Sequence, residues 1–488
     1  MEYVEKKSSP KKNFLYNIIY QILILIIPLI TAPYLSRVVG VNGIGTYSYT
    51  YSIVYYFMLL TLLGVNNYGN RSIAKVRDDK MKRSKTFWSI YMLQLLMGII
   101  MLAVYILYIV LFDNEYKVIS KIEMLFIVSA MLDINWFFFG MEEFKKTITR
   151  NIFVKVGTIV LIFLLVKSPN DLWIYTLIMS GMTCLSQLIL WMFLKKRIVK
   201  VKIKISDVIQ HIKPNIILFI PVIAVSLYKM MDKIMLGIIA NVDEVGYYEN
   251  AEKIINIPMT LITALGTVML PRISNIMAKG ESKKVSDYIS KSVRFVMFMS
   301  CAMCGGLICI GYNFAPLYFG NEFQKTGILI MLLSVTLPFL SFANVLRTQY
   351  IIPKEKDKIY IISVSLGAVI NLIMNFIFIP KFASIGACFG TILAEVTVMV
   401  YQAYATRKDL NIKEYFKNTY SYVIKALIML LCTYPLNFIN MNNYIRILVQ
   451  VIVGCVVYGI INMKYIITIL NINRIGPIKI SIKKEGVK

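Results

Sequence analysis

The sequence has few of the residues that soluble enzymes and metal proteins use for chemistry. Its 488 residues include one histidine, seven cysteines and four tryptophans, with 26 acidic side chains against 53 lysines and arginines. All seven cysteines stand in apolar stretches, where a reduced thiol behaves as a small hydrophobic side chain. Cys301 and Cys304 have no second CxxC or neighbouring histidine, so we predict neither a metal site nor another cofactor. The single histidine, His211, falls in a polar segment, where we expect it to be solvated.

Long polar segments are missing as well. The longest have about twenty residues, too few for a separate soluble domain, and the ATP-binding motif GxxxxGKS or GxxxxGKT does not occur. A membrane polymerase, ligase or glycosyltransferase generally carries its catalytic groups on a sizeable extramembrane loop. We therefore expect a protein that is not an enzyme, and keep such an enzyme as the less favoured alternative.

Apolar residues dominate what is present. They make up 58% of the chain, charged residues make up 16%, and the mean hydropathy is +0.67. Apolar runs of about twenty residues, the length that crosses a bilayer, predict an all-helical membrane protein with about fourteen spans. The predicted spans are 14–34, 44–64, 86–112, 122–140, 151–167, 172–194, 214–239, 254–271, 292–314, 327–350, 359–380, 384–404, 419–438 and 445–466.

The basic residues are unevenly distributed. The formal net charge is +27, but the lysines and arginines stand in short clusters between apolar runs, as in cytoplasmic membrane loops rather than in a nucleic-acid-binding surface. With both termini in the cytoplasm, about 42 of the 53 fall on inner segments. The sequence therefore predicts a multi-pass membrane protein with cytoplasmic termini and without a nucleic acid partner.

The chain also repeats itself. Residues 35–47 (LSRVVGVNGIGTY) resemble residues 236–248 (LGIIANVDEVGYY), and the aligned Gly45 and Gly246 are 201 residues apart. Because each half has an even number of spans, the halves share one orientation and predict a pseudo-two-fold axis along the membrane normal. The predicted division is an N-lobe of helices 1–6 (1–194), a basic cytoplasmic linker (195–213), a C-lobe of helices 7–12 (214–405), and helices 13–14 with a basic cytoplasmic tail (406–488).

Three charges inside one predicted span mark the strongest candidate site. Lys229, Asp232 and Lys233 stand at positions i, i+3 and i+4 of the span 214–239, so they project from one side of a helix. Each charge costs about 2.5 to 3.5 kcal/mol near the middle of a bilayer, so these side chains must face protein, water or ligand. They line a transport pathway, or Lys229 pairs with Asp232 as a structural bridge while Lys233 reaches the interface.

Two arginines are further candidates for binding an anion. Arg37 stands at the outer end of helix 1, and Arg347 stands near the inner end of helix 10. A guanidinium offers phosphate two parallel hydrogen bonds, which suits a cavity wall. Either arginine can instead anchor its helix at the membrane interface.

The remaining intramembrane polar groups are acids and amides. Asp133 in helix 4 and Glu395 in helix 12 can bind a coupling ion or neutralise a basic neighbour. Asn371 and Asn375 stand one turn apart on helix 11, where they can contact sugar or hold helices together.

Several short motifs resemble a known family. They are SRVVG at 36–40 with GIGTY at 43–47, DKIMLG at 232–237 with VGYY at 245–248, the pair Asn371 and Asn375, IP at 379–380, and IGA at 385–387. Together they resemble the oligosaccharide repeat-unit flippases (polysaccharide biosynthesis proteins, Wzx-like) of the multidrug/oligosaccharidyl-lipid/polysaccharide exporter superfamily. The resemblance extends over nearly the whole chain.

The resemblance implies a MATE-like transporter with about fourteen helices in two lobes. It would move undecaprenyl-diphosphate-linked oligosaccharide repeat units from the inner to the outer leaflet of a bacterial cytoplasmic membrane, for capsule, O-antigen or related polymers. Alternating access around a cationic cavity is implied, and Arg37, Lys229, Lys233 and Arg347 are the positions here that could line it. The implied partners are the lipid-linked oligosaccharide, membrane lipids, a polysaccharide polymerase and a chain-length regulator. A drug or organic-cation antiporter of the same superfamily is the alternative.

Overall fold

The chain folds as a bundle of long helices. The structure, a computed structural model, describes residues 10–195 and 197–472, without the side chains of residues 10–25, 144, 145, 221, 228, 229, 282 and 470–472. Within these ranges every regular element is helical.

The α-helices are α1 Pro10–Leu62, α2 Val65–Val76, α3 Lys80–Leu111, α4 Lys117–Met131, α5 Asn135–Gly140, α6 Phe144–Leu165, α7 Leu172–Leu194, α8 Ile205–Ile209, α9 Ile212–Ile239, α10 Val242–Ala278, α11 Ser282–Phe319, α12 Gln324–Ser334, α13 Thr336–Leu346, α14 Asp357–Phe382, α15 Ser384–Thr406, α16 Ile412–Thr433, α17 Asn443–Ile461 and α18 Met463–Ile472. The short helices are η1 Pro169–Asp171, η2 Asn321–Phe323, η3 Arg347–Ile351, a π-helix, and η4 Tyr434–Phe438.

Local chemistry explains where several helices begin and bend. The Asp79 carboxylate accepts hydrogen bonds from two backbone amides in the first turn of α3. The Asn241 side chain does the same for the Glu244 amide at the start of α10. Inside α1, Gly40 has φ +71°, a left-handed conformation that glycine adopts without a side-chain clash, and the helix is kinked there.

The predicted all-helical membrane fold is confirmed. Eleven helices of the described chain are long and apolar enough to cross a membrane, or twelve if 321–334 and 336–351, bent by 42°, form one span. The predicted span 14–34 falls within α1 before its kink, and 44–64 begins in α1 after the kink and runs two residues past its end at Leu62. The span 214–239 corresponds to α9. The count of fourteen stays a prediction.

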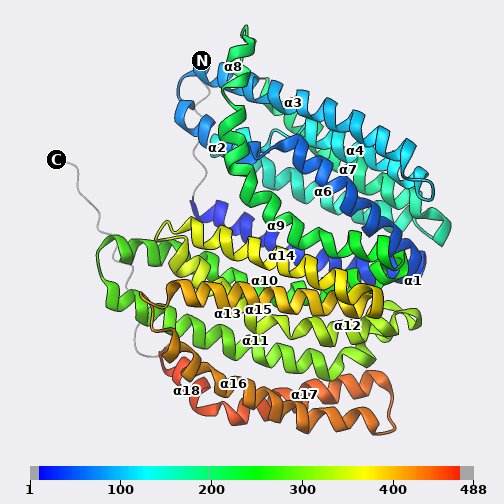
Figure 1. Ribbon diagram of the computed structural model, residues 1–488, viewed down its shortest axis with the longest axis vertical. Helices are drawn as coiled ribbons and strands as arrows, with labels where there is room; N and C mark the ends of the chain where they lie inside the picture. The colour runs from blue at the N-terminus through cyan, green and yellow to red at the C-terminus, as the bar shows by residue number, and fades with distance from the viewer. Residues whose placement is uncertain (1–9, 196, 473–488) are drawn as a thin grey trace.

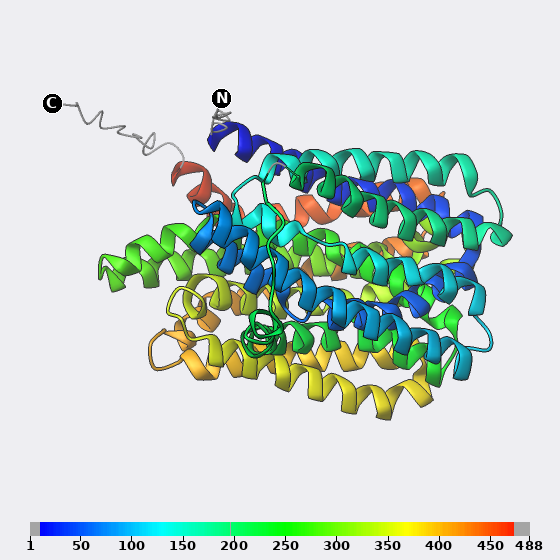
Figure 2. The same ribbon diagram turned by 90° about the horizontal axis from the view of Figure 1, so that it is seen from above.

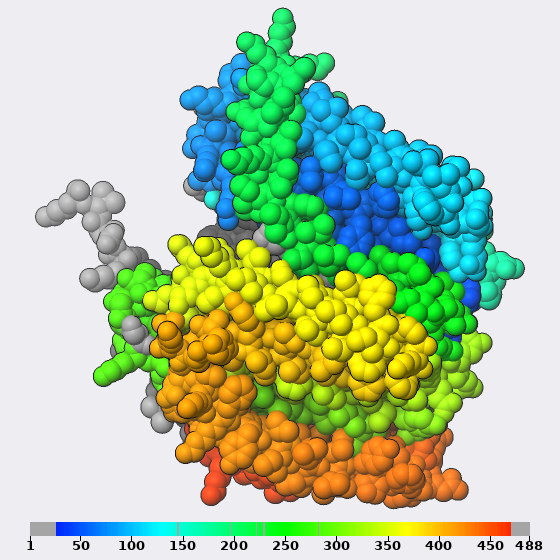
Figure 3. Space-filling model, in the orientation of Figure 1, coloured from blue at the N-terminus to red at the C-terminus, as the bar shows by residue number. Residues whose placement is uncertain are grey.

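The helices form two groups that meet at one end. In Figure 1, α2 to α7 lie together at the top, α10 to α15 lie below them, and α1 and α9 run between the two groups. The helices α16 to α18 cover the lower edge. Figure 3 shows the two groups in contact at the right and spread apart at the left. In Figure 2, α1 begins and α18 ends toward the end of the bundle at which α10 and α11 extend beyond their neighbours.

The two groups touch where α1 crosses α10, at equivalent positions of the sequence repeat. A Cβ atom on Gly45 would lie 1.8 Å from the Val242 carbonyl oxygen, and one on Gly246 would lie 2.4 Å from the Val41 carbonyl oxygen. The contact is reciprocal, because Gly45 faces Val242 and Gly246 faces Val41, and each residue of one copy is 201 residues from its equivalent in the other. Asn42 and Asp243, another equivalent pair, share a 3.0 Å hydrogen bond. Reciprocal contact is the mark of a two-fold axis, so the predicted pseudo-symmetry is confirmed at this crossing.

The predicted solvation of His211 is wrong. His211 is buried between helices, not solvated: its Nδ1 lies 2.7 Å from the Tyr68 hydroxyl and its Nε2 2.9 Å from the Ser89 hydroxyl. The reason is that α9 packs against α2 and the preceding α8 packs against α3, which local polarity does not reveal. Burial lowers the pKa of this imidazole, although Asp207 opposes the shift.

Candidate functional site: a polar cavity and a buried ion-pair network

A cavity of about 350 Å³ lies between α9 and the second group of helices. Its wall is formed by α9, α10, α12, α13, α14 and α15 together with the first residue of η3. Among the described side chains, four charged ones line it: Asp232, Glu252, Arg347 and Glu395. Three carboxylates and one guanidinium therefore face the same space, and the surrounding hydrogen bonds decide which of them can meet a ligand.

Asp232 is held by hydrogen-bond donors from three other helices. Its Oδ2 accepts from the Tyr248 hydroxyl and the Thr391 hydroxyl, each at 2.8 Å, and its Oδ1 accepts from Asn375 Nδ2 at 2.6 Å. Asn371 stands behind Asn375, with its Oδ1 3.3 Å from the same amide nitrogen. Both asparagines are buried; Asn375 links α14 to α9, and Asn371 contacts Asn375 within α14.

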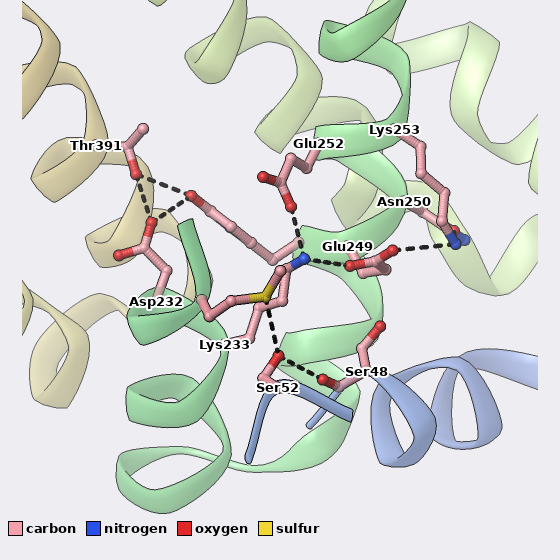
Figure 4. A network of polar contacts seen from close by, with 11 residues as sticks. Ser48, Ser52, Asp232, Lys233, Glu249, Asn250, Glu252, Lys253 and Thr391 are labelled. Atoms are coloured by element: carbon pink, nitrogen blue, oxygen red, sulfur yellow. Dashed lines mark hydrogen bonds and ion pairs between the residues drawn. The ribbon is translucent and has the colours of Figure 1, made fainter. Parts of the chain in front are cut away.

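Lys233 is clamped between two acids of α10. Its Nζ lies 2.6 Å from a Glu249 oxygen and 2.8 Å from a Glu252 oxygen (Figure 4). The other Glu249 oxygen lies 3.4 Å from Lys253 Nζ. The lysine is buried in this arrangement, while Asp232 accepts hydrogen bonds from neutral donors. Lys229 belongs to α9, but its side chain lies outside those that the structure describes.

Arg347 and Glu395 are the ionisable groups of the cavity wall that have no ion-pair partner among the described side chains. Glu395 is 4% exposed, and within the described chain its carboxylate has no hydrogen-bond or ion-pair partner. The Arg347 guanidinium likewise has no carboxylate within ion-pair distance there, and stands 5.6 Å from the centre of the Tyr360 ring. Both groups are therefore available to a ligand.

The other two predicted residues lie away from this cavity. Arg37 is exposed on α1 and donates a 2.8 Å hydrogen bond to the Leu317 carbonyl of α11. Asp133 lies in the break between α4 and α5, where it accepts from the Asn135 backbone and side chain at 2.8 and 2.6 Å. Arg150 donates to the side-chain oxygen of the same asparagine at 2.9 Å, so Asp133 belongs to a polar cluster of the first group.

Three buried or ion-paired acids were not predicted from the sequence: Glu123, Glu249 and Glu252. Glu249 and Glu252 complete the Lys233 network, and Glu123, in α4, is fully buried and accepts from the Thr50 hydroxyl at 2.9 Å. Glu249 and Glu252 are three residues apart, a spacing that places both on one face of a helix. They were missed because the predicted span began at 254, whereas α10 begins at Val242 and includes both. Nothing in the local sequence distinguishes Glu123 from a lipid-interface residue.

Similar proteins of known structure share this fold. The lipid II flippase MurJ in an inward closed conformation superposes with a TM-score of 0.74 over 93% of this chain and 99% of its own, at 18% identity. An inward-facing multidrug resistance MATE family transporter of the MOP superfamily superposes with a TM-score of 0.59 over 80% of this chain and 99% of its own, at 12% identity. At such identities the likeness concerns the fold, and it confirms the predicted MATE-like architecture.

Sequence comparison gives the family. A protein of Shigella dysenteriae named as a candidate O-antigen transporter is 23% identical over 81% of this chain and 100% of its own length. A protein of Escherichia coli (strain K12) with the same name is 25% identical over 80% of this chain and 95% of its own. Residues 11–277, more than half of the chain, match the family model described as polysaccharide biosynthesis protein. The chain therefore belongs to the polysaccharide biosynthesis protein family, as its motifs predicted.

Proposed function

We propose that this protein is a flippase for lipid-linked oligosaccharides. It translocates undecaprenyl-diphosphate-linked repeat units from the inner to the outer leaflet of a bacterial cytoplasmic membrane, for O-antigen, capsule or a related polymer. Membership of the polysaccharide biosynthesis protein family, relatives named as O-antigen transporters and the MurJ-like fold all support the proposal. A polymerase and a chain-length regulator would then act on the translocated units, and both termini of the chain would lie in the cytoplasm.

The observation that carries the proposal is a polar cavity inside an apolar bundle. A diphosphate and a glycan cannot cross hydrocarbon unaided, because each unsatisfied polar group costs several kcal/mol there. The 350 Å³ cavity offers such groups carboxylates, hydroxyls, amides and a guanidinium. The outer surface of the bundle carries exposed apolar stripes, such as Leu448, Ile452, Val456 and Ile460 on one face of α17. With the cell interior negative, an anionic head moving outward gains about 2.3 kcal/mol per charge per 100 mV.

A second, apolar cavity suits the lipid tail. It measures about 510 Å³ and lies among α10, α11, α16 and α17, with Ile257, Pro258 and Leu261 of α10 in its wall. The polar cavity is lined by neighbouring residues of the same helix, among them Asn256 and Thr260. One helix therefore separates a polar from an apolar compartment, as a substrate with a polar head and an isoprenoid tail requires.

Alternating access would use the crossing of α1 and α10. The two groups of helices touch there and spread apart at the other end of the bundle (Figure 3). Rocking the predicted N-lobe (1–194) against the predicted C-lobe (214–405) about this contact would open the opposite side. The kink at Gly40 and the prolines Pro28 and Pro33 of α1 give that helix the freedom to bend.

The predicted cations would act in different states of this cycle. Arg347 already faces the cavity and would take the diphosphate first. Lys233 would become available only when Glu249 and Glu252 release it, and Lys229 is its neighbour on α9. Arg37 lies beside the kink of α1, at the predicted outer end of its first span, and would meet the head group on its exit.

The predicted acids would balance these charges or couple transport to an ion. Asp232, with two hydroxyls and an amide around it, offers the oxygen ligands that a proton or small cation needs. Glu395, also in the cavity wall, has no hydrogen-bond or ion-pair partner among the described side chains. Asp133 is remote from both and would be structural. Asn371 and Asn375 would support Asp232 rather than touch the glycan.

A drug or organic-cation antiporter is the second candidate, and one observation favours it. The described cavity wall has three carboxylates against one guanidinium, so the cationic cavity expected for a flippase is not evident from this wall alone. Asp232 and the Glu252–Lys233 pair are internally satisfied, however, which leaves Glu395 and Arg347 in balance.

Leaflet-resolved detection of the substrate separates the two functions. The protein is depleted in its native host, and a sugar-specific lectin is applied to intact and then to permeabilised cells. A flippase predicts inward-facing lipid-linked oligosaccharide that disappears on re-expression. An unchanged leaflet distribution together with altered dye efflux would contradict the proposal and support the antiporter.

A further inference from the structure

The segment that joins α7 to α9 is fixed to the first group of helices through its backbone. The Arg83 guanidinium of α3 donates a hydrogen bond to the Arg197 carbonyl oxygen at 2.7 Å, and Trp88 Nε1 donates to the Val199 carbonyl oxygen at 3.0 Å. The Val199 amide donates in turn to the Ser84 hydroxyl at 3.0 Å. We call residues 197–209, which end with α8, the linker strap. Because its backbone is held to α3, the directions of its side chains are set.

The linker strap presents three lysines to its surroundings. Lys200, Lys202 and Lys204 are exposed, and the apolar residues between them are only partly exposed. This period of two is that of an extended chain, in which alternate side chains point to one side, so the three lysines share a face. Among the described residues, no carboxylate lies within 4.0 Å of their ammonium groups. Three cations that the protein does not neutralise, on an ordered backbone, favour an anionic partner.

Two isoleucines stand directly after these lysines. Ile205 and Ile209 of α8 are 78% and 57% exposed, and their spacing of four residues places them on one face of the helix. The neighbouring helix ends are exposed and apolar too, with Met192 near the end of α7 and Ile217 in the first turns of α9. The linker strap is therefore continuous at both ends with surface that faces lipid. Apolar side chains beside a row of lysines suit a lipid surface better than a soluble acidic protein.

The length of α3 places the linker strap at the level of the lipid head groups. The 32 residues of α3 extend over about 48 Å, whereas the hydrocarbon core of a bilayer is about 30 Å thick. Part of α3 must lie outside the hydrocarbon, and its first turns, which carry Lys80 and Lys82 and bind the linker strap, are the charged end. In Figure 1 the long helices run across the page, and α8 stands at the upper edge beside α3. Figure 3 shows this part projecting sideways from the bundle, along the membrane surface.

We infer that the linker strap is a binding surface for anionic phospholipids, in the inner leaflet by the predicted topology. Lys200, Lys202 and Lys204 contact the lipid phosphates, and the two isoleucines of α8 enter the boundary of the hydrocarbon. Because the linker strap connects α7 to α9, bound lipid holds the start of α9 at the membrane surface. The inference is independent of the substrate that the protein carries.

A fluorescent probe on α8 tests this assignment. Ser206 is exposed, so Ser206→Cys is introduced in a background without the native cysteines and labelled with the polarity-sensitive dye NBD. The full-length protein is reconstituted in phosphatidylcholine vesicles with increasing fractions of phosphatidylglycerol. We expect the NBD emission to shift to the blue, and its quenching by doxyl-labelled lipid to increase, as the phosphatidylglycerol fraction rises. Joint replacement of the three lysines by glutamine should remove most of this response, because each lysine near an anionic surface strengthens binding about fivefold.

A matched variant controls for the loss of charge. Lys279, Lys283 and Lys284 are also exposed, but they stand where α10 turns into α11, in the part that extends beyond the bundle in Figure 2. Their joint replacement by glutamine should leave the response unchanged. Raising the salt concentration should weaken the response of the unsubstituted linker strap, which tests the charge without any substitution of the lysines. Ile205→Ser together with Ile209→Ser should reduce the quenching by doxyl-labelled lipid.

Three results would overturn the assignment. The first is an emission that is the same at every phosphatidylglycerol fraction, or a response that survives replacement of Lys200, Lys202 and Lys204. The second is an equal blue shift when inorganic phosphate is added to pure phosphatidylcholine vesicles, since the surface would then bind soluble anions. The third is quenching by aqueous iodide that does not fall as phosphatidylglycerol is added, which would leave the lysines in solvent and favour an acidic protein as their partner.

Discussion

The crossing of α1 and α10 should tolerate no side chain. A Cβ atom on Gly45 would lie 1.8 Å from a backbone oxygen, where ordinary contacts begin at 3.4 Å. The two backbones would have to separate by roughly 1.5 Å, because a carbonyl in a helix cannot move aside on its own. Overpacking of this kind costs about 1–3 kcal/mol, while alanine in place of glycine returns up to about 1 kcal/mol of helix propensity. We expect Gly45→Ala to destabilise the protein.

The equivalent glycine on α10, Gly246, allows a comparison with Gly45. Gly246→Ala should act in the same direction but less strongly, because its Cβ would lie 2.4 Å from the opposing oxygen. Gly181→Ala is the control, since a Cβ there would meet nothing within 4 Å. The assay is Tm in detergent, with Gly45→Ala lowest, Gly246→Ala next and the control at or above wild type.

A cross-link reports the same contact directly. Asn42 and Asp243 lie beside the crossing and share a 3.0 Å hydrogen bond, so cysteines at both positions should form a disulfide in a background without the native cysteines. Adding Gly45→Ala should reduce the yield of that disulfide. A Gly45→Ala protein with wild-type Tm and full cross-linking would refute the reasoning.

Three further predictions concern charged and titratable groups. Lys229→Ala should abolish polymer export while the protein stays in the membrane, and normal export from a well-expressed variant would remove Lys229 from the pathway. Lys233→Ala should lower Tm strongly, by the equivalent of about 3–5 kcal/mol, because it leaves two buried carboxylates without their cation. Lys233→Arg should lose less. Burial holds the pKa of His211 below its ordinary value of about 6.5, so the stability that the neutral ring contributes is present above that pH and is lost as pH falls through the lowered value. Wild-type Tm should therefore fall between pH 7 and pH 5, and His211→Asn should fall less; equal slopes would show that another group titrates.

The sequence was sufficient for the architecture because apolar length and repeat spacing are local properties. Residues 35–47 and 236–248 could be aligned without any structure, and their glycines do meet. The partner of Lys233 could not be read in the same way. Its two carboxylates belong to the first turns of α10, which begins at Val242 and carries them into the bundle, whereas the hydropathy of 242–253 marks that segment as a loop.

The same limitation applies to Arg347 and Glu395. Their positions inside apolar spans could be predicted, because charges there stand out against the hydropathy. That they share one cavity depends on how α13 and α15 pack, and helix packing in a membrane is decided by small residues and polar contacts distant in sequence. Arg37, an equally conspicuous charge, lies elsewhere for the same reason.

The two copies of the repeat share the backbone contact at the crossing but differ in their charged residues. Positions 201 residues before the charged cluster hold uncharged residues: Thr31, Ala32, Ser48 and Tyr51 stand where Asp232, Lys233, Glu249 and Glu252 stand in the second copy. Figure 4 draws Ser48 and Ser52 of α1 together with the cluster, and Ser52 donates a 2.6 Å hydrogen bond to the Ser48 carbonyl oxygen. The crossing glycines occur in both copies, so under the proposed alternating access the shared backbone would provide the contact about which the two predicted lobes rock. The ion-pair network of Lys233, Glu249 and Glu252 occurs in the second copy alone, so we expect substrate selection to depend on the second copy.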